Sequence, residues 1–128
     1  FMIPITILLF YLLLHWYADF VCQTDKQAKS KSSNNLQLLA HTGTYGLIVT
    51  LFTYILYWTN CFGAQYWYTP LIFGVIQFVT HTVVDWITSR INKKFWEYKL
   101  VHEFFVMVGF DQFIHYAIMF GTLWILFY

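Results

Sequence analysis

Charged side chains are scarce in this sequence. Only 10% of the 128 residues are Asp, Glu, Lys or Arg, whereas 59% are hydrophobic and 23% are aromatic. A soluble domain carries roughly 25% charged residues, and so few charges cannot cover the surface of a water-soluble globule of this length. The composition therefore excludes an ordinary soluble fold and indicates a membrane protein.

Several residue patterns that carry well-known chemistry are also absent. The chain has two cysteines, so a structural zinc site built from thiolates is not expected. Its five histidines are fewer than the set that membrane di-iron hydroxylases and desaturases use. There is no Ser-His-Asp arrangement, phosphate-cradling glycine loop or nucleic-acid motif. The net charge of +1 points neither to nucleic acid nor to an acidic partner.

The charges that are present are unevenly distributed. Three lysines and an aspartate lie within residues 25–31, and four basic and two acidic residues lie within residues 90–103. The remaining three are Asp19, Asp85 and Asp111, each bordered by apolar and aromatic residues. These three aspartates fall outside the polar stretches and need a separate explanation.

The apolar runs predict four membrane-spanning helices, near residues 3–22, 36–59, 69–89 and 104–127. Helices are expected because a spanning segment must satisfy its own backbone hydrogen bonds, and the runs are too long for barrel strands. The first run lacks a basic leading region and a small-residue cleavage site, so we expect a true span rather than a signal peptide. The expected fold is an all-α four-helix bundle, with residues 1–128 forming one integral membrane domain.

The positions of the basic residues predict the topology. All seven Lys and Arg residues lie in the first and third connections, and the positive-inside rule places both in the cytoplasm, with both termini outside. We expect the bacterial inner membrane as the location, lipids as partners and no nucleic acid; a homodimer and a subunit of a membrane complex both remain open. Residues 91–102 mix lysines with aromatic residues, which favours an interfacial amphipathic helix.

Seven ionisable side chains fall inside the predicted spans, where each costs roughly 2.5–3.5 kcal/mol. They are His15, Asp19, His41, His81, Asp85, Asp111 and His115. Three of the spans contain a His/Asp pair four residues apart, which places both side chains on one helix face. The first and third spans read His then Asp, and the fourth, which runs in the opposite direction, reads Asp then His. Every Asp therefore lies nearer the cytoplasm and every His one turn deeper.

This order predicts a funnel that opens to the cytoplasm. The three aspartates and His41 are expected at its mouth, with His15, His81 and His115 below them. Gln23 extends the first polar face by one turn, as Gln77 does for the third, and Gln112 follows Asp111 in the fourth span. The polar residues thus form one expected constellation inside an apolar bundle.

Imidazole and carboxylate groups are ligands of zinc, manganese and iron. We therefore predict that the seven intramembrane residues hold a divalent metal, with zinc first and manganese or iron as alternatives, either as one ion or as two that share aspartates. The candidate catalytic residues are Asp19, Asp111 and Glu103. The candidate substrate-binding residues are Gln23, Lys26, Lys29 and Gln112, because a lysine of the first basic loop could hold a substrate phosphate.

Two other interpretations of the constellation stay open. The His/Asp pairs could be structural contacts between helices, typically worth about 0.6 kcal/mol each, in a non-enzymatic scaffold, a phage or host envelope factor or a complex subunit. They could also form an ion or proton path, although the outer halves of the spans hold no ionisable residue. The preferred hypothesis is metal-dependent hydrolysis or transfer on a lipid or another membrane-associated phosphoester.

The motifs also resemble those of a known family. The stretch from His15 to Thr24, His41, His81 with Asp85, and Asp111 with His115 match in order and spacing a family of small bacterial and phage integral membrane proteins. This family is catalogued as domain of unknown function 3307, and the resemblance covers essentially the whole chain. The chain is similar, more remotely, to membrane-bound predicted metal-dependent hydrolases with His and Asp ligands in their helices. That second resemblance implies a shared fold and ligand type.

Overall fold

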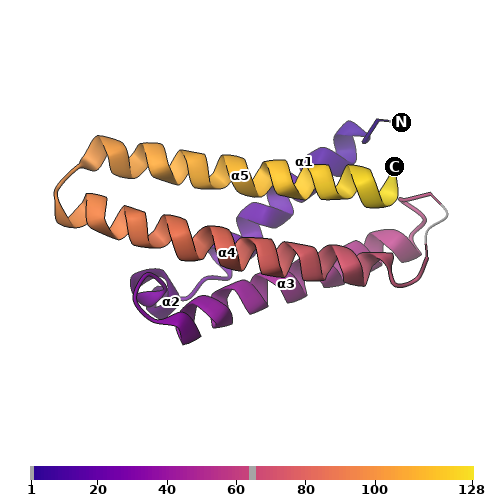
Figure 1. Ribbon diagram of the computed structural model, residues 1–128. Helices are drawn as coiled ribbons and strands as arrows, with labels where there is room; N and C mark the ends of the chain where they lie inside the picture. The colour runs from indigo at the N-terminus through magenta and orange to yellow at the C-terminus, as the bar shows by residue number, and fades with distance from the viewer. Residues whose placement is uncertain (1, 64–65) are drawn as a thin grey trace.

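Helices form the regular secondary structure of the residues that the computed structural model describes, which are 2–63 and 66–128 (Figure 1). The expected all-α class is therefore confirmed. The elements are α1 Ile5–Trp16, the π-helix η1 Tyr17–Val21, α2 Asp25–Ser30, α3 Asn35–Trp58, α4 Thr69–Glu97 and α5 Val101–Phe127.

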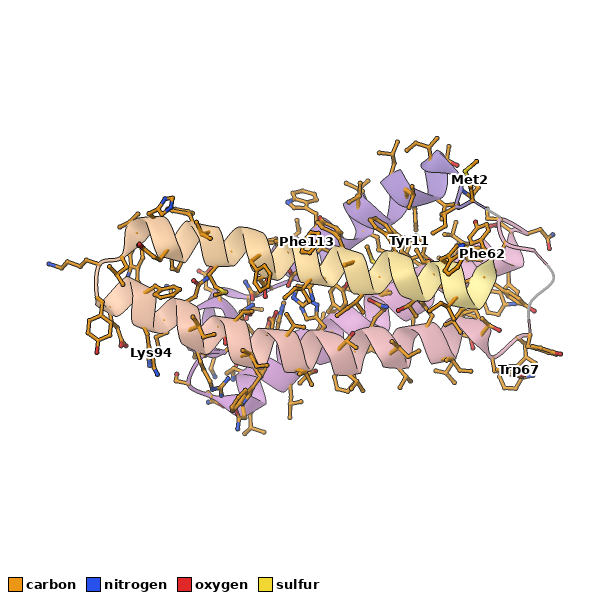
Figure 2. The ribbon with its side chains drawn as sticks, turned by 45° about the horizontal axis from the view of Figure 1, so that its top comes forward. Met2, Tyr11, Phe62, Trp67, Lys94 and Phe113 are labelled. Atoms are coloured by element: carbon orange, nitrogen blue, oxygen red, sulfur yellow. The ribbon has the colours of Figure 1, made fainter. Side chains whose placement is uncertain are left out.

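The three long helices α3, α4 and α5 lie side by side, and α4 packs against both of the others (Figure 1). One end of the bundle, here called the terminal end, carries both chain termini and the segment between α3 and α4. The other end, here called the basic end, carries α2 and the turn between α4 and α5. In Figure 2, Met2, Phe62 and Trp67 lie at the terminal end, and Lys94 lies at the basic end.

Three of the helices are long and apolar enough to cross a membrane: α3 with 24 residues, α4 with 29 and α5 with 27. The first helix is shorter, with 12 α-helical and 5 π-helical residues, about 25 Å in all against a hydrocarbon core of about 30 Å. Large apolar side chains face outward on every long helix; Leu47 is 75% exposed, Val83 54% and Ile125 74%. An apolar exterior around buried charges fits a membrane protein.

The helices begin and end at recognisable capping motifs. Thr24 and Gln27 form a capping box that starts α2, and the Asn34 side chain accepts hydrogen bonds from two backbone N–H groups at the start of α3. Helices α3 and α4 both end in a Schellman motif, with Asn60 at φ 58° and Lys99 at φ 57° in the left-handed position. The tight turn at Lys99 folds α5 back along α4.

The interfacial helix expected over residues 91–102 is not formed. Helix α4 continues without a break to Glu97, and α5 starts at Val101. The lysines and aromatic residues of this segment instead occupy the last turns of α4 and the turn that follows. Nothing in residues 91–97 breaks a helix, so the chain extends the span until Lys99 adopts the left-handed conformation.

The half of the bundle near the terminal end has an apolar core. Tyr11 is fully buried, packs edge-on against Phe73 and bonds through its hydroxyl to Thr53 at 2.8 Å. Two glycines let α3 and α4 approach closely: a Cβ on Gly46 would lie 2.8 Å from the Cβ of Phe78, and one on Gly74 would overlap the side chain of Thr50. Helix association in lipid depends on such close packing.

The first helix stops near the middle of the bundle. The π-helical turn η1 ends at Val21, whereas α4 continues for about three turns beyond Asp85. Beyond η1, the chain leaves the helix axis and forms α2, which packs against α3 (Figure 1). The end of η1 therefore places polar side chains in the middle of the bundle and leaves space between α4, α5 and the segment around α2.

Candidate metal centre

Side chains from three helical segments converge at the end of η1. Asp19 comes from η1, His41 from α3, and His81 and Asp85 from α4; one ligand atom of each lies within 4.8 Å of the others. All four residues are buried. A second group of the same kind joins Asp85 to two residues of α5, Asp111 and His115. Asp85 belongs to both groups, so the two sets of ligand atoms are continuous.

The distances within the first group suit metal ligation. The Nε2 atom of His41 lies 3.0 Å from Oδ1 of Asp19 and 3.5 Å from Oδ2 of Asp85. The Nε2 atom of His81 lies 3.2 Å from Oδ1 of Asp19 and 3.7 Å from Oδ1 of Asp85. Ligands about 2.0–2.1 Å from a tetrahedral zinc lie roughly 3.3–3.4 Å apart. The group therefore already has nearly the spacing that an ion would impose.

The second group has similar spacing but is more open. The Nε2 atom of His115 lies 3.1 Å from Oδ1 of Asp85 and 3.4 Å from Oδ1 of Asp111. Asp111 is only partly buried, and its Oδ1 atom also accepts a hydrogen bond from Thr88 at 2.6 Å. This group can bind an ion with fewer protein ligands and leave room for water or substrate.

His81 is the least satisfied side chain of the cluster. Its ring is stacked between Tyr45, with centroids 3.9 Å apart, and His115, with centroids 4.0 Å apart. Neither ring nitrogen has a hydrogen-bond partner among the described residues, although the ring is buried. Buried polar atoms are normally paired, and an Nε2 lone pair fixed beside two carboxylates is what a cation would use.

His15 lies beside the two groups rather than inside either of them. Its Nδ1 atom bonds to the hydroxyl of Tyr45 at 2.8 Å, and its Nε2 atom bonds to Oε1 of Gln112 at 2.9 Å. The amide of Gln112 donates to Asp19 at 3.1 Å and to Asp111 at 3.0 Å. Neutral His15 with its proton on Nε2 completes this chain, so His15 orients the amide that holds two carboxylates.

Lys31 enters the cluster from outside the spans. Its Nζ atom lies 2.8 Å from Oδ2 of Asp85, and its side chain is only 20% exposed. Burial would lower the pKa of Lys31, but the carboxylates of Asp85 and Asp19 outweigh burial and raise the pKa above its usual value. The lysine therefore stays charged and neutralises part of the carboxylate cluster.

The place of Lys31 in the site is not evident from the sequence. Lys31 is one of several basic residues in its loop, and a contact 54 positions along the chain leaves no local pattern. The capping-box signature of Thr24 and Gln27 is the signal that could have helped. It predicts a short helix that turns the chain back after η1 and so brings Lys31 over the aspartates.

A cavity of about 260 Å³ adjoins the cluster on its basic side. Asp19, Asp85 and Asp111 all line it, together with Gln23 and Gln112. The four intramembrane histidines are buried and lie behind this wall. The expected order, with aspartates toward the opening and histidines deeper, is therefore seen, except that His41 lies among the buried residues and not at the mouth.

The remaining candidates for catalysis and substrate binding are placed differently. Lys29 lines a second cavity, of about 470 Å³, next to the first. Lys26 is exposed on α2. Glu103 is exposed and lines a separate apolar pocket with His102, so the structure does not bring it to the aspartates. An acid-base role for Glu103 at this cluster therefore has no geometric support.

Comparison with known proteins identifies a family. A family model described as protein of unknown function, DUF3307, matches residues 7–127, nearly the whole chain. No curated protein and no solved structure matches.

Proposed function

The chain belongs to the DUF3307 family, and we propose that it is a membrane protein that holds a divalent metal ion, zinc first, in its buried His/Asp cluster. The observation that carries this proposal is the convergence of Asp19, His41, His81 and Asp85 within 4.8 Å. Imidazole and carboxylate donors at this spacing suit zinc, and they also suit manganese or iron.

Charge balance supports a divalent ion. Asp19, Asp85 and Asp111 carry three negative charges, and Lys31 supplies one positive charge. If the histidines are neutral, as metal ligation requires, two negative charges remain in a site surrounded by apolar helices, where unpaired charge is costly. A divalent cation would balance these charges and use the lone pair of His81.

The metal content of the purified protein tests this proposal. Wild-type protein in detergent is expected to retain about one or two ions per chain, measured by inductively coupled plasma mass spectrometry. Asp85→Asn keeps the shape of the side chain but removes a charge shared by both ligand groups, so it should lose the ion. Glu97→Gln, an exposed carboxylate on the same helix, is the matched control and should keep it. Wild-type protein without stoichiometric metal would end the proposal.

We further propose hydrolysis or group transfer on a lipid or another membrane-associated phosphoester. When bound, the ion would lower the pKa of a coordinated water toward about 7 and polarise the substrate oxygen. Asp111 lines the cavity, is the least buried of the three aspartates and is held by Thr88 and Gln112. In this proposal its carboxylate accepts the proton of a reacting water, and Asp19 is the alternative acceptor.

A turnover screen tests this second step. Wild-type protein and Asp111→Asn are compared on radiolabelled membrane phospholipids in mixed micelles, after both are shown to contain metal. We expect turnover by wild type only. Equal turnover by the two proteins would contradict a role for Asp111, and no turnover by wild type on any lipid or phosphoester would contradict the enzymatic proposal.

A structural role is the second candidate, and one observation favours it. The hydrogen-bond chain from Tyr45 through His15 and Gln112 to Asp19 links α1, α3, α5 and η1 without any ion. In this alternative, the polar core fixes helix packing in a scaffold, an envelope factor or a complex subunit. Metal-free protein with unchanged helix packing, shown by cysteine cross-linking between α1 and α5, would favour it.

We also propose that the basic end faces the cytoplasm of a bacterial inner membrane. All seven Lys and Arg residues lie at this end, as the positive-inside rule requires for a cytoplasmic side. Membrane lipids would be the immediate partners, and a homodimer or a larger membrane complex is tested by cross-linking in native membranes. Labelling of single cysteines at positions 94 and 67 in intact cells and in inverted vesicles tests the orientation.

A further inference from the structure

A second cavity continues the first toward the basic end of the bundle. The first cavity is lined by three aspartates, and the second is lined by Lys29, Lys31 and Lys93. The two share part of their walls, including Lys31, Ser89 and Asn92. A molecule of moderate size could therefore occupy both, with one part among lysines and another beside the carboxylates.

The lysines of the second cavity are arranged to bind an anion. Lys29 comes from α2, Lys93 from the last turns of α4, and Lys31 from the segment that joins α2 to α3. Lys93 makes a loose ion pair with Glu97 at 3.9 Å, and both side chains are about half exposed. Such a pair is weak in water, so Lys93 remains available to an anion. Lys29 and Lys93 therefore supply two ammonium groups that suit a phosphate, and Lys31, which is paired with Asp85, lies in the wall that the two cavities share.

Unpaired polar atoms line the first cavity, and two of them lie where it meets the second. Oγ of Ser89, Oδ1 of Asn92 and Oε1 of Gln23 are buried and have no hydrogen-bond partner among the described residues. All three residues line the first cavity. The unpaired oxygens of Asn92 and Gln23 are acceptors, so their missing partner must carry donor groups. Hydroxyl groups fit better than an ammonium group, which the neighbouring lysines would repel.

Apolar side chains complete the second cavity. Trp96, Phe104 and Ala28 line it, and it lies at the end of two spans, at the depth where lipid headgroups meet water. Trp96 is 62% exposed, as expected of an aromatic residue at the membrane interface. An amphiphile could keep its acyl chains in lipid while its phosphate lies among the lysines.

We infer that the joined cavities bind the headgroup of an anionic phospholipid that carries hydroxyl groups. Lys29 and Lys93 hold its phosphate, and the oxygens of Asn92 and Gln23 accept hydrogen bonds from its hydroxyl groups. This inference rests on the proposed function in one respect, since it makes such a lipid the substrate presented to the aspartates. The binding itself needs no metal.

Two pairs of lysines give a matched test. Lys29→Gln/Lys93→Gln changes the cavity, and Lys26→Gln/Lys94→Gln changes the neighbouring lysines of α2 and α4 that do not line it. Both double variants lower the net charge equally. Binding of short-chain phosphatidylglycerol to protein in neutral detergent is measured by isothermal titration calorimetry at physiological salt. The cavity pair should weaken binding by roughly tenfold, and the control pair by less than about twofold.

A third variant and a second ligand test the hydroxyl contacts. Asn92→Leu should weaken binding of phosphatidylglycerol by about fivefold and leave phosphatidic acid, which lacks the headgroup hydroxyls, unchanged. Inorganic phosphate distinguishes a lipid from a free phosphate: tight binding of phosphatidylglycerol alone assigns the site to a lipid. Equally tight binding of inorganic phosphate with the same lysine dependence would contradict a lipid headgroup site and assign the lysines to free phosphate.

Several results would overturn the inference. Equal weakening of phosphatidylglycerol binding by the two double variants would mean that the lysines act only through the general charge of the surface. Wild-type protein that binds no phosphatidylglycerol would contradict the site itself. Metal content is measured on the same samples, because none of these substitutions alters a proposed metal ligand. Wild-type protein that contains metal but binds no lipid contradicts the headgroup site alone, and wild-type protein that binds lipid but contains no metal contradicts the metal proposal alone.

Discussion

Toward the terminal end, Tyr11, Phe73 and Leu123 pack as fully buried side chains, whereas near the middle of the bundle the same helices bury Asp19, His81 and Asp85. In the apolar half, ring contacts and the close approach of α3 and α4 fill the interior. The polar half contains unpaired buried atoms and adjoins two cavities. Lipid could replace many contacts of the apolar half, but it cannot solvate the carboxylates. The first half therefore holds the fold, and the second contains the His/Asp groups that could hold a metal ion.

The largest effect is expected for a change that leaves buried charge unpaired. Asp85→Ala removes the partner of Lys31 and His115, so we expect about 3–5 kcal/mol lower stability together with loss of metal. Unfolding in mixed micelles, followed by circular dichroism, measures the change. Glu97→Ala, on the same helix and exposed, should stay within about 0.5 kcal/mol of wild type. A similar loss of stability in both variants would contradict the distinction between the apolar half and the polar half of the bundle.

Removal of metal should affect the polar half alone. A chelator is expected to lower the free energy of unfolding by about 2.7 kcal/mol relative to protein at a metal concentration of a hundred times Kd. The same loss is expected in Phe73→Ala, whose site is intact. Asp19→Asn, which lacks a proposed ligand, should show no response. A chelator effect that persists in Asp19→Asn would place the ion elsewhere.

A cavity in the apolar half should reduce stability without releasing metal. Phe73 is fully buried, and Phe73→Ala is expected to cost about 2 kcal/mol. This is below the loss of about 3–5 kcal/mol in water-soluble cores, because in lipid only the packing loss remains. Metal content should equal that of wild type. Loss of metal from Phe73→Ala would show that the two halves are coupled.

Helix approach in the apolar half can be tested with two glycines. Gly74→Ala would place a Cβ against Thr50 and force α3 and α4 apart, at a cost of about 1–2 kcal/mol. A Cβ added to Gly43 on α3 would meet nothing within 4 Å, so Gly43→Ala should be neutral or slightly stabilising. Thermal unfolding in one detergent compares them. Equal midpoints for the two variants would mean that the close approach contributes nothing.

The smallest effect is expected in the turn between α4 and α5. Lys99 adopts φ 57°, which costs a residue with a side chain about 1 kcal/mol relative to glycine. Lys99→Gly should therefore stabilise the protein by about that amount and leave metal content unchanged. Lys94→Gly, within the helix α4, should instead destabilise it. A change in metal content in Lys99→Gly would extend the site to the turn.

Local sequence patterns predicted most of the fold. The apolar runs located α3 and most of α4 and α5, because a membrane span needs a long run of apolar side chains whatever its neighbours are. The predicted end of the third span, at Ser89, was wrong, because the polar residues after Ser89 continue helix α4 past the apolar run as far as Glu97. Hydropathy marks where a helix meets water, whereas a backbone turn such as that at Lys99 marks where it ends.

The candidate site was predicted in composition but not in detail. The spacing of four residues placed His81 with Asp85 and Asp111 with His115 on shared faces, and both pairs do meet. The partners that come from other helices, such as Gln112 for His15, depend on helix rotation and tilt. Such contacts leave no periodicity in a single sequence.

The π-helical turn η1 changes the direction in which side chains of the first helix point before and after it. Its hydrogen bond from the N–H of Cys22 to the carbonyl of Tyr17 spans five residues, so the chain winds more slowly there than in an α-helix. The slower winding lets Tyr11 face the apolar core while Asp19, two turns later, still faces His41. Deleting Ala18, which precedes Asp19 in this turn, would rotate every earlier side chain of the helix by up to about 100° relative to Asp19. The turn thus lets one short helix contribute side chains both to the apolar core and to the His/Asp cluster.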